Sequence, residues 1–487
     1  MFALHVPRPA PRPLQFDRQS ATAPLLSTDP PGFSEAAEPS LPRYWPASSG
    51  TAFYGIASAP QGGVFTFSRG LPGDAPASIG MAELGVFSPS NSGAKEPLAQ
   101  QWSFVHEGSR IQLEINYNQH GYLLRIDDRF ISLDPHRSTG RTIVTLDFGS
   151  HRRRRIDLIS WALSFGGVFT DPTDSIYAAE LRGPRTIVFG DSFTTPEPTN
   201  WVNWFAHAMG WDDVWASGAG GTGFVADALG TAWALPERVA HDIAPYDPKL
   251  VLVQAGLNDF TAQPADVLSS VTETVRRIRA SCPDAIIAGG ANAAYGVESY
   301  DAQALDVADA IRVGMEDNGA VWLSPLELPL EYGGQPIGAE ASLQFDVAAG
   351  QAGNDGDPAT VNFPNGFTCS TATDTPLSNL RNGSVVEIGS GATRERVAIT
   401  SVGYFVGRLV YGFDGAMRYA HAAGEPVREV GPCFVTGQGN TLSPNGWGSA
   451  DRFVGSDGFH YSPEGHRALG AANASLLRAA LRERMLI

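Results

Sequence analysis

The sequence predicts a mixed α/β fold, in which a parallel sheet covered by helices is combined with β-rich segments. From about residue 185, apolar strands such as "RTIVFG", "DVWASG" and "KLVLVQAG" alternate with helix-like stretches, and the strands are apolar on both faces. Strands of this kind are typical of a parallel sheet with helices on both sides. The chain has 487 residues, with 54 glycines and 35 prolines, so we expect two or three domains and many turns.

The first 183 residues are predicted to form an arm and a β-domain. Residues 1–50 are dense in proline and small polar residues, a composition that favours extended segments over packed structure. Residues 51–183 contain short alternating runs such as "RIQLEINYN" and "GYLLRIDDRFISL", separated by turn residues. Alternation with period two is typical of an antiparallel β-sandwich, which we expect to be jelly-roll-like.

The helix–strand alternation is interrupted once, which divides the α/β domain into residues 184–334 and 451–487. Residues 335–450 contain no convincing helix, and "SVVEIGSGATRERVAITSVGYFVGRLVYGF" alternates with period two, so we predict a β-rich insertion. Helical sequence resumes at "SPEGHRALGAANASLLRAALRERML". There Ser462 is suited to cap the helix and Pro463 to occupy its first position.

The charge and hydropathy of the chain argue against two classes of partner. A net charge of −17 repels phosphate backbones, and we interpret the one basic run, residues 151–155, as a solvated strand end, so no nucleic acid is expected. No stretch of about 18 apolar residues could span a bilayer, and the N-terminus lacks the apolar core of a signal peptide. We therefore expect a soluble protein without a membrane partner. Cytoplasmic, non-classically exported and virion-associated locations stay open.

The cysteines indicate neither a zinc site nor a disulfide framework, because Cys282, Cys369 and Cys433 form no Cys-x-x-Cys pair. A bond between Cys369 and Cys433 stays open, since it requires their strands to be neighbours. No metal and no cofactor are expected. The sequence leaves the oligomeric state undecided, and a homo-oligomer is among the options.

Ser192 is the first candidate for chemistry. It follows the strand "RTIVF" in the tripeptide Gly190, Asp191 and Ser192. A hydroxyl at a strand-to-helix junction lies near free backbone N–H groups and the positive end of the helix dipole, which suits a nucleophile that develops an anion. The alternative is a serine that only caps the helix, which is the more common role at such turns.

Two further loops follow apolar strands and offer hydrogen-bond donors. The loop "GAGGTGF", residues 218–224, allows the backbone to approach a substrate closely, and it lacks the lysine of a phosphate-binding loop. Asn258 in "GLND" supplies a neutral amide donor that can stabilise an oxyanion. Both stretches can also be read as simple tight turns.

Asp457 and His460 stand in "DGFH", directly before the C-terminal helix. A histidine that acts as a general base needs a partner for its other ring nitrogen, and a carboxylate three residues earlier can reach it. The other candidate histidines, His207, His241 and His466, lie in helix-like segments without such a partner, so we expect surface or core roles for them.

Taken together, these four stretches resemble the SGNH hydrolase superfamily, also called GDSL esterases and lipases, whose four sequence blocks occur in this order. The resemblance implies a three-layer α/β/α sandwich with a parallel, flavodoxin-like sheet. It also implies a catalytic set of Ser192 as nucleophile, His460 as base and Asp457 as the acid that orients His460.

The resemblance further implies an oxyanion hole formed by the backbone N–H groups of Ser192 and Gly221 and by the side-chain amide of Asn258. One departure concerns the glycine block, which begins with Asn in many members. Here Ala216 or Ser217 holds that place, so the choice between Gly220 and Gly221 stays open.

An N-terminal β-sandwich joined through "FGGVFTDPTDSIYAAELRGPRTIVFGDSF" is similar to the arrangement in some carbohydrate esterases and in hydrolases encoded by phages. The resemblance implies a serine ester hydrolase with an acyl-enzyme mechanism. Its substrate would be an acetylated carbohydrate or another small ester, and the reaction the O-deacetylation of a polysaccharide or oligosaccharide. Two alternatives stay open: a lipase or short-chain carboxylesterase, and a virion or surface protein, structural or glycan-binding, with an ancillary hydrolase domain.

Overall fold

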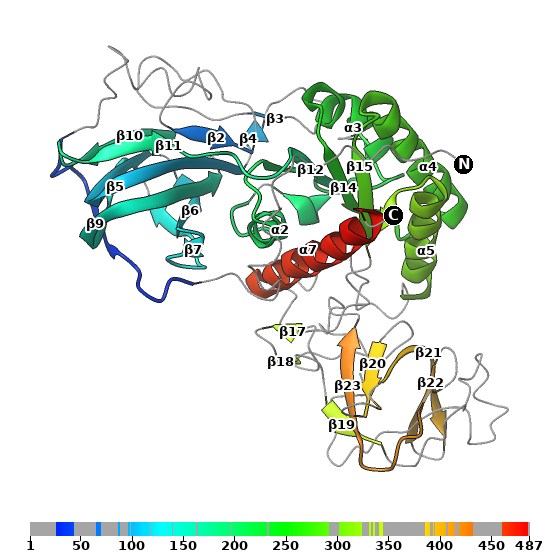
Figure 1. Ribbon diagram of the computed structural model, residues 1–487. Coiled ribbons are helices and arrows are strands. Elements are labelled where there is room, and N and C mark those ends of the chain that lie inside the picture. Colours follow the sequence, from blue (N-terminus) through cyan, green and yellow to red (C-terminus); the bar gives the residue numbers. More distant parts are fainter. Residues whose placement is uncertain are drawn as a thin grey trace.

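The computed structural model describes three groups of secondary-structure elements: an N-terminal antiparallel sheet, an α/β domain and a smaller β-rich region (Figure 1). The described residues are 26–42, 65–69, 86–87, 96–97, 99–116, 118–138, 140–161, 164–195, 197–230, 233–291, 301–323, 331–332, 335–336, 340–343, 385–389, 393, 395–405, 408–413, 417, 419–431 and 460–485.

The α/β domain contains a five-stranded sheet in the order β13-β12-β14-β15-β16, and all of its strand pairs are parallel. Counted along the chain, this is the order 2-1-3-4-5 of a flavodoxin-like sheet. The predicted parallel sheet is therefore confirmed. Its strands are β12 (Thr186–Gly190), β13 (Val214–Gly218), β14 (Leu250–Ala255), β15 (Ile286–Ala291) and β16 (Val321–Trp322).

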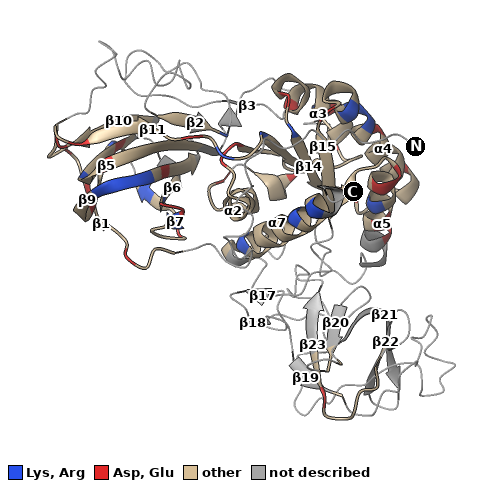
Figure 2. Ribbon diagram, in the orientation of Figure 1, with Lys and Arg blue, Asp and Glu red and all other residues tan. Residues whose placement is uncertain are grey.

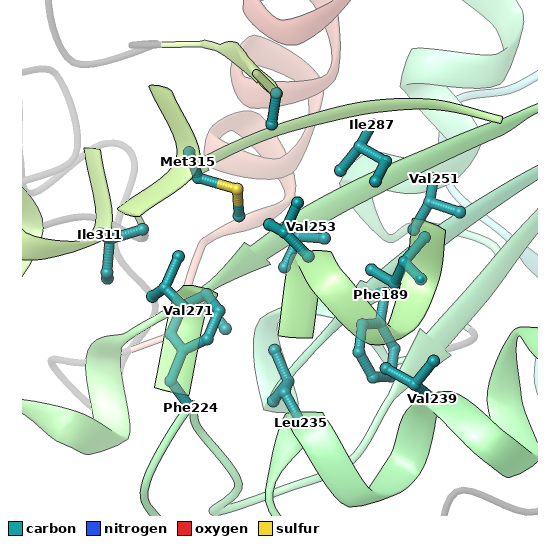
Figure 3. Close-up of a cluster of buried hydrophobic side chains, with 14 of the residues drawn as sticks. Phe189, Phe224, Leu235, Val239, Val251, Val253, Val271, Ile287, Ile311 and Met315 are labelled. Carbon is teal, nitrogen blue, oxygen red and sulfur yellow. The ribbon is translucent and has the colours of Figure 1, made fainter. Parts of the chain in front are cut away.

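Helices cover both faces of this sheet. Successive side chains of a strand point to opposite faces, so each strand contributes to two hydrophobic cores. On β12, Val188 belongs to the core under α2 and α7, while Ile187 and Phe189 belong to the core under α3, α4 and α5 (Figures 1 and 3). The helices are α2 (Trp201–Met209), α3 (Leu235–Asp242), α4 (Pro264–Ser281), α5 (Asp301–Asp317) and α7 (Pro463–Met485). Within the described ranges, no helix is both long and apolar enough to cross a membrane.

The N-terminal strands pair into one nine-stranded sheet around the long strands β5 and β9. An irregularity between Gly108 and Arg110 shifts the side-chain alternation of β5, so Trp102 and Phe104 before it and Ile111 after it face the same core. The division into two sheets of a jelly-roll-like sandwich stays a prediction. The strands are β1 (Gly32–Ala36), β2 (Thr66–Ser68), β5 (Ala99–Asn116), β6 (Asn118–Ile126), β7 (Arg129–Phe130), β8 (His136–Ser138), β9 (Thr142–Trp161), β10 (Ser164–Thr170) and β11 (Ser175–Ala178).

The region predicted as an insertion contains a five-stranded antiparallel sheet in the order β19-β23-β20-β21-β22. Its long strands β21 and β22 fall in the stretch where the sequence alternates with period two, as expected. The strands are β19 (Glu340–Ser342), β20 (Val385–Ile388), β21 (Glu395–Phe405), β22 (Arg408–Phe413) and β23 (Pro426–Gly431). Two short pairs complete the described strands: β3 (Val86–Phe87) with β4 (Glu96–Pro97), and β17 (Glu331–Tyr332) with β18 (Gln335–Pro336).

Part of the proline-rich arm lies along the N-terminal sheet. Strand β1 pairs antiparallel with β9, in a register that sets Gly32 opposite Asp147. Further along, the backbone N–H groups of Ser40 and Leu41 both donate to the side-chain oxygen of Gln112 at 2.9 Å. These contacts join the described part of the arm to the β-domain.

The basic run on β9 differs from the expected solvated strand end. It lies in the interior of a long strand, where Arg152 and Arg153 are exposed but Arg154 is buried (Figure 2). The Arg154 guanidinium lies 4.2 Å from the centre of the Phe148 ring. Arg155 points the other way, toward the α/β domain, where it bonds to Asp212 at 2.9 Å. The two exposed arginines also have partners, since Arg152 pairs with Asp127 at 3.7 Å and the Arg153 guanidinium lies 4.7 Å from the centre of the Tyr177 ring.

Arg155 belongs to a buried cluster of charges that joins the N-terminal sheet to the α/β domain. Asp157 on β9 accepts hydrogen bonds from Arg125 on β6 and from Arg155, both at 2.9 Å. Asp212, which precedes β13, accepts from Arg155 at 2.9 Å and from Arg182 at 3.1 Å. Arg125 also reaches Asp212, at 3.3 Å. Both carboxylates are fully buried, so each depends on the shared arginines for its charge partners.

The pairing changes the acidity of both carboxyl groups. Burial alone raises the pKa of Asp157, but the guanidinium groups of Arg125, Arg155 and Arg182 hold the pKa of this carboxyl well below its usual value. Burial likewise opposes ionisation of Asp212, and its bond and charge interaction with Arg182 and the charge of Arg155 lower its pKa. Such groups stabilise the fold above their unfolded pKa, about 4, and lose that contribution as the pH falls through the folded value.

We expect Asp212→Asn to lower the free energy of unfolding by about 3–5 kcal/mol at pH 7, because Arg125, Arg155 and Arg182 each lose one of their two carboxylate partners. Urea unfolding measures the effect. As the pH is lowered from about 5 to 3, the wild type loses linked stability and the difference from the variant should shrink. Asp128→Asn is the control, because this carboxylate also bonds Arg182, at 2.7 Å, but is 37% exposed. A loss no larger than that of the control would contradict the expectation.

Candidate active site

The loops predicted to carry chemistry follow three neighbouring parallel strands. Ser192 opens a 3₁₀ turn, η1 (Ser192–Thr194), directly after β12, and the glycine-rich loop follows β13. Asn258 lies in η3 (Leu257–Asp259), directly after β14. Since β12 pairs with both β13 and β14, the carboxyl ends of these strands share one edge of the sheet, where ligands of such folds bind.

The structure brings Ser192 and His460 together. The Ser192 Oγ and the His460 Nε2 are 3.0 Å apart, within hydrogen-bonding distance, although the residues are 268 positions apart in the chain. His460 precedes α7, and its ring lies 5.0 Å, centre to centre, from that of Phe193. A hydroxyl and an imidazole at this distance can exchange a proton, as a nucleophile and its base must.

The turn that carries Ser192 is held tightly against the strand ends. The side chain of Asp191 is buried and accepts a hydrogen bond from the Phe193 N–H at 3.0 Å, which caps the turn. A Cβ on Gly190 would lie 2.3 Å from the Gln254 carbonyl oxygen, and one on Gly218 would lie 2.3 Å from the Thr194 backbone. Only glycine permits this approach, so both glycines are explained by packing.

The glycine-rich loop lies beside Ser192. A Cβ on Gly220 would be 4.0 Å from the Ser192 Cβ, while Gly221 has a φ of +72° and turns the chain toward Ala228. In the part of the chain that the structure describes, the backbone N–H groups of Gly220 and Gly221 have no protein acceptor. Gly220 therefore lies next to the nucleophile and Gly221 follows it in the same turn, and the choice between them as oxyanion donor stays open.

Asn258 is bonded to the same loop. Its side-chain nitrogen donates to the Thr222 carbonyl oxygen at 2.8 Å, and the side chain is half-buried. An amide nitrogen carries two hydrogens, so one donor remains beyond the bond to Thr222. Asn258 thereby combines a fixed position with a remaining neutral donor.

Asp259 has a role that the sequence interpretation missed, because it was read only as a turn residue. Its buried carboxylate accepts hydrogen bonds from three successive backbone N–H groups, those of Phe224, Val225 and Ala226, at 2.7, 2.9 and 2.8 Å. Burial raises the pKa of Asp259, and the three N–H bonds oppose that rise. Asp259 thus holds the distal end of the glycine-rich loop, next to Asn258 in sequence.

Arg238 on α3 is the second residue that was missed. Its side chain is fully buried and donates to the carbonyl oxygens of Gly190 and Ser217, at 2.7 and 2.9 Å. The sequence clue to this role is the four-residue spacing of Arg238 and Asp242, which places both on one face of a helix. In the structure they form an ion pair at 2.9 Å.

Asp457, Cys369 and Cys433 lie outside the described residues, so the predicted orienting acid and the open disulfide stay predictions. Cys282 is a buried free thiol. Among the residues that the structure describes, no group of three or more His, Cys, Asp and Glu side chains could hold a metal ion.

The remaining candidate histidines have structural surroundings. His207 is buried beside Arg125, with 3.3 Å between the ring Nδ1 and the guanidinium, and burial lowers its pKa well below the usual value. His466 accepts a hydrogen bond from the Trp201 N–H at 3.2 Å, and burial together with the charges of His460 and Arg467 lowers its pKa to about 3. The ring of His241 stacks on Trp233. These positions agree with the expected core and surface roles.

A serine within hydrogen-bonding distance of an imidazole at the carboxyl edge of a flavodoxin-like sheet is the arrangement that a serine hydrolase of the α/β class requires. Residues 188–340 match the model of the GDSL-like Lipase/Acylhydrolase family. This segment is therefore similar to GDSL-like acylhydrolases, in agreement with the resemblance that the sequence motifs indicate. The matched segment includes Ser192, Gly221 and Asn258, while His460 lies beyond it.

Several solved structures are similar to part of the chain. An acetyl xylan esterase from the rumen bacterium Butyrivibrio proteoclasticus is 15% identical over 53% of this chain and 89% of its own, with a TM-score of 0.37. A family two carbohydrate esterase from Cellvibrio japonicus is 18% identical over 51% and 86%, with a TM-score of 0.38. A salicylyl-acyltransferase from a tetracycline biosynthetic pathway is 14% identical over 54% and 83%, with a TM-score of 0.40. No curated protein matches the chain.

We expect Asp259→Asn to loosen the glycine-rich loop, because an amide cannot accept three N–H bonds as a carboxylate does. Hydrogen exchange at Phe224, Val225 and Ala226 should accelerate about tenfold or more, since bonds to a charged group each contribute about 1.5–3 kcal/mol. Asp227→Asn is the control, because this exposed carboxylate accepts a single hydrogen bond within the described residues, from the Gly230 N–H at 3.0 Å. Equal protection in both variants would show that Asp259 does not hold the loop.

Proposed function

We propose that the protein is a serine ester hydrolase that acts through an acyl-enzyme, with Ser192 as nucleophile and His460 as general base. The observation that carries the proposal is the 3.0 Å contact between the Ser192 Oγ and the His460 Nε2 at the carboxyl edge of the sheet. It is supported by the family match of the segment that contains Ser192. Asp457 would orient His460 through the other ring nitrogen.

The reaction follows from these positions. His460 takes the proton of Ser192 as the Oγ attacks the ester carbonyl, and the carbonyl oxygen becomes an oxyanion. We assign its stabilisation to the Ser192 N–H, the Gly221 N–H and the remaining side-chain N–H of Asn258. His460 then returns the proton to the leaving alcohol, which departs and leaves an acyl group on Ser192. Water, deprotonated by the same base, releases the acid and regenerates the hydroxyl.

The proposed substrate is an acetyl ester on a polysaccharide or oligosaccharide. This class rests on the resemblance of the joining segment, residues 165–193, to that of carbohydrate esterases with an N-terminal β-domain. In the structure the segment leaves the N-terminal sheet by β10 and β11 and enters β12, which ends at Gly190, just before Ser192. We retain the domain division into residues 1–50, 51–183, 184–334 with 451–487, and 335–450.

The alternative of a scaffold with an inactive hydrolase domain is disfavoured by the bond between Ser192 and His460. A structural or binding protein has no need of a serine, an imidazole and a placed amide at one strand edge. The acetylesterase and the lipase differ in the length of the acyl chain they accept, because a lipase must bind a long acyl chain in an apolar site.

We expect Ser192→Ala to abolish both ester hydrolysis and covalent labelling by a fluorophosphonate, because both require the hydroxyl. Asn258→Ala should lower kcat by about a hundredfold or more, the usual effect of removing an oxyanion donor. Asn318→Ala is the matched control, because its amide also donates to a carbonyl oxygen, that of Gly314 at 2.8 Å, but at the end of α5 and not in the loops of the candidate site. Folded wild-type protein that is neither labelled nor active would refute the enzyme and favour the scaffold.

We expect the wild type to hydrolyse p-nitrophenyl acetate with a higher kcat/KM than the octanoate. Acetate should also be released from acetylated polysaccharides, by an amount that Ser192→Ala does not produce. A preference for the octanoate would overturn the acetylesterase and support the lipase. Hydrolysis of the acetate without action on any acetylated polysaccharide would restrict the protein to small esters.

A further inference from the structure

The guanidinium of Arg238 is surrounded by hydrogen-bond partners from the framework of the site. Besides the carbonyl oxygens of Gly190 and Ser217, it donates to the Thr222 Oγ at 3.0 Å and to the Ser217 Oγ at 3.2 Å. Its Nε donates to Asp242 at 2.9 Å. These bonds account for all five N–H donors of an arginine. One planar group therefore connects the strand that precedes Ser192 with the strand and loop that precede Thr222.

The ion pair with Asp242 explains how the buried charge of Arg238 is stabilised, but it does not explain the direction of the other N–H groups of the guanidinium. Both side chains are fully buried, and the guanidinium also lies 4.7 Å from the centre of the Phe189 ring. An ion pair needs only the bond from Nε. The remaining donors are directed to the ends of β12 and β13 and to the glycine-rich loop, which are the parts that must be held at fixed spacing around a substrate carbonyl.

Thr222 extends the connection to the oxyanion donors. Its hydroxyl accepts from Arg238 and donates to the Ala219 carbonyl oxygen at 2.8 Å, across the turn that contains Gly220 and Gly221. Its own carbonyl oxygen accepts the amide of Asn258 at 2.8 Å. A continuous chain of bonds thus runs from Gly190 through Arg238 and Thr222 to Asn258.

We propose that Arg238 and Thr222 are positioning residues, whose bonds set the spacing between the Ser192 hydroxyl and the oxyanion donors. The inference rests on the proposed ester hydrolysis and assigns a task to two residues that do not touch the reacting atoms. A displacement of about 1 Å between nucleophile and donors can cost about a hundredfold in rate. Weakening the chain of bonds should therefore lower kcat while ester binding, and hence KM, changes little.

Thr222→Val is the principal test, because it keeps the volume of the side chain and removes both hydroxyl bonds. We expect kcat to fall by about 10- to 100-fold, with KM within about threefold, whereas Thr222→Ser should restore kcat to within about threefold. Arg238→Lys keeps the charge beside Asp242 but has three donors on one nitrogen and cannot span both strand ends, so kcat should fall in the same way.

A boronic acid that forms a tetrahedral adduct with Ser192 provides a second readout, because its adduct also needs the oxyanion donors. Its inhibition constant should weaken in Thr222→Val and Arg238→Lys by about the factor lost in kcat/KM. Val239→Ala is the matched control, since it removes buried contacts from the same helix without touching the bonded chain. We expect the control to lower the melting temperature and leave both kcat and boronate inhibition unchanged.

The outcomes separate this inference from the function on which it rests. A wild type that neither hydrolyses esters nor binds the label at Ser192 would refute the proposed function. An active wild type, with a folded Thr222→Val variant that keeps kcat and boronate inhibition within about twofold, would overturn the positioning role alone. The positioning role would also be overturned if Val239→Ala lowered kcat as much as Thr222→Val, because the fall in kcat would then reflect a general loss of folding stability.

Discussion

The parallel pairing of β12 with both β13 and β14 is the constraint on which the site depends. It sets Gly190 beside Gly218 on one side and beside Gln254 on the other, so three loops begin at the same level of the sheet. Each of these loops carries a different group that the proposed mechanism uses or could use: a hydroxyl, the N–H groups of Gly220 and Gly221, and an amide. His460, the fourth contribution, arrives from a distant part of the chain because α7 packs on the same face of the sheet as α2.

Parallel strands fix where the loops begin, but buried charges determine how the loops are held. A guanidinium can bond several oxygens at once only if its charge has a partner, and Asp242 is that partner for Arg238. Asp259 has the opposite role, because its single carboxylate accepts hydrogen bonds from three backbone N–H groups. Both side chains form hydrogen bonds with backbone atoms, and these bonds hold the loops whether or not a substrate is present. For the proposed ester hydrolysis, donors held in this way need no rearrangement when a substrate binds, as electrostatic stabilisation requires.

Sequence patterns predict the parts of this structure whose causes are local. β12, β13 and β14 are buried on both faces, so they are apolar throughout and easily recognised, and Ser192 and Asn258 stand directly after two of them. The roles of Arg238 and Asp259 are not visible in this way, because their partners are backbone atoms 48 and 33–35 positions away. The basic run was misread for the same reason. Whether Arg155 is solvated depends on Asp212 of another domain, and not on its neighbours in sequence.

The charge cluster around Asp212 and Asp213 and the buried Arg238 lie at opposite ends of the same two strands. At the amino ends, Arg185 before β12 bonds Asp213 before β13 at 3.0 Å, and the neighbouring Asp212 bonds Arg125 and Arg155 of the N-terminal sheet. At the carboxyl ends, Arg238 joins Gly190 to Ser217. The strand that precedes Ser192 is therefore held at both ends. Without the N-terminal sheet, Asp212 would lose two of its guanidinium partners, so the sheet belongs to the structural unit that places the nucleophile.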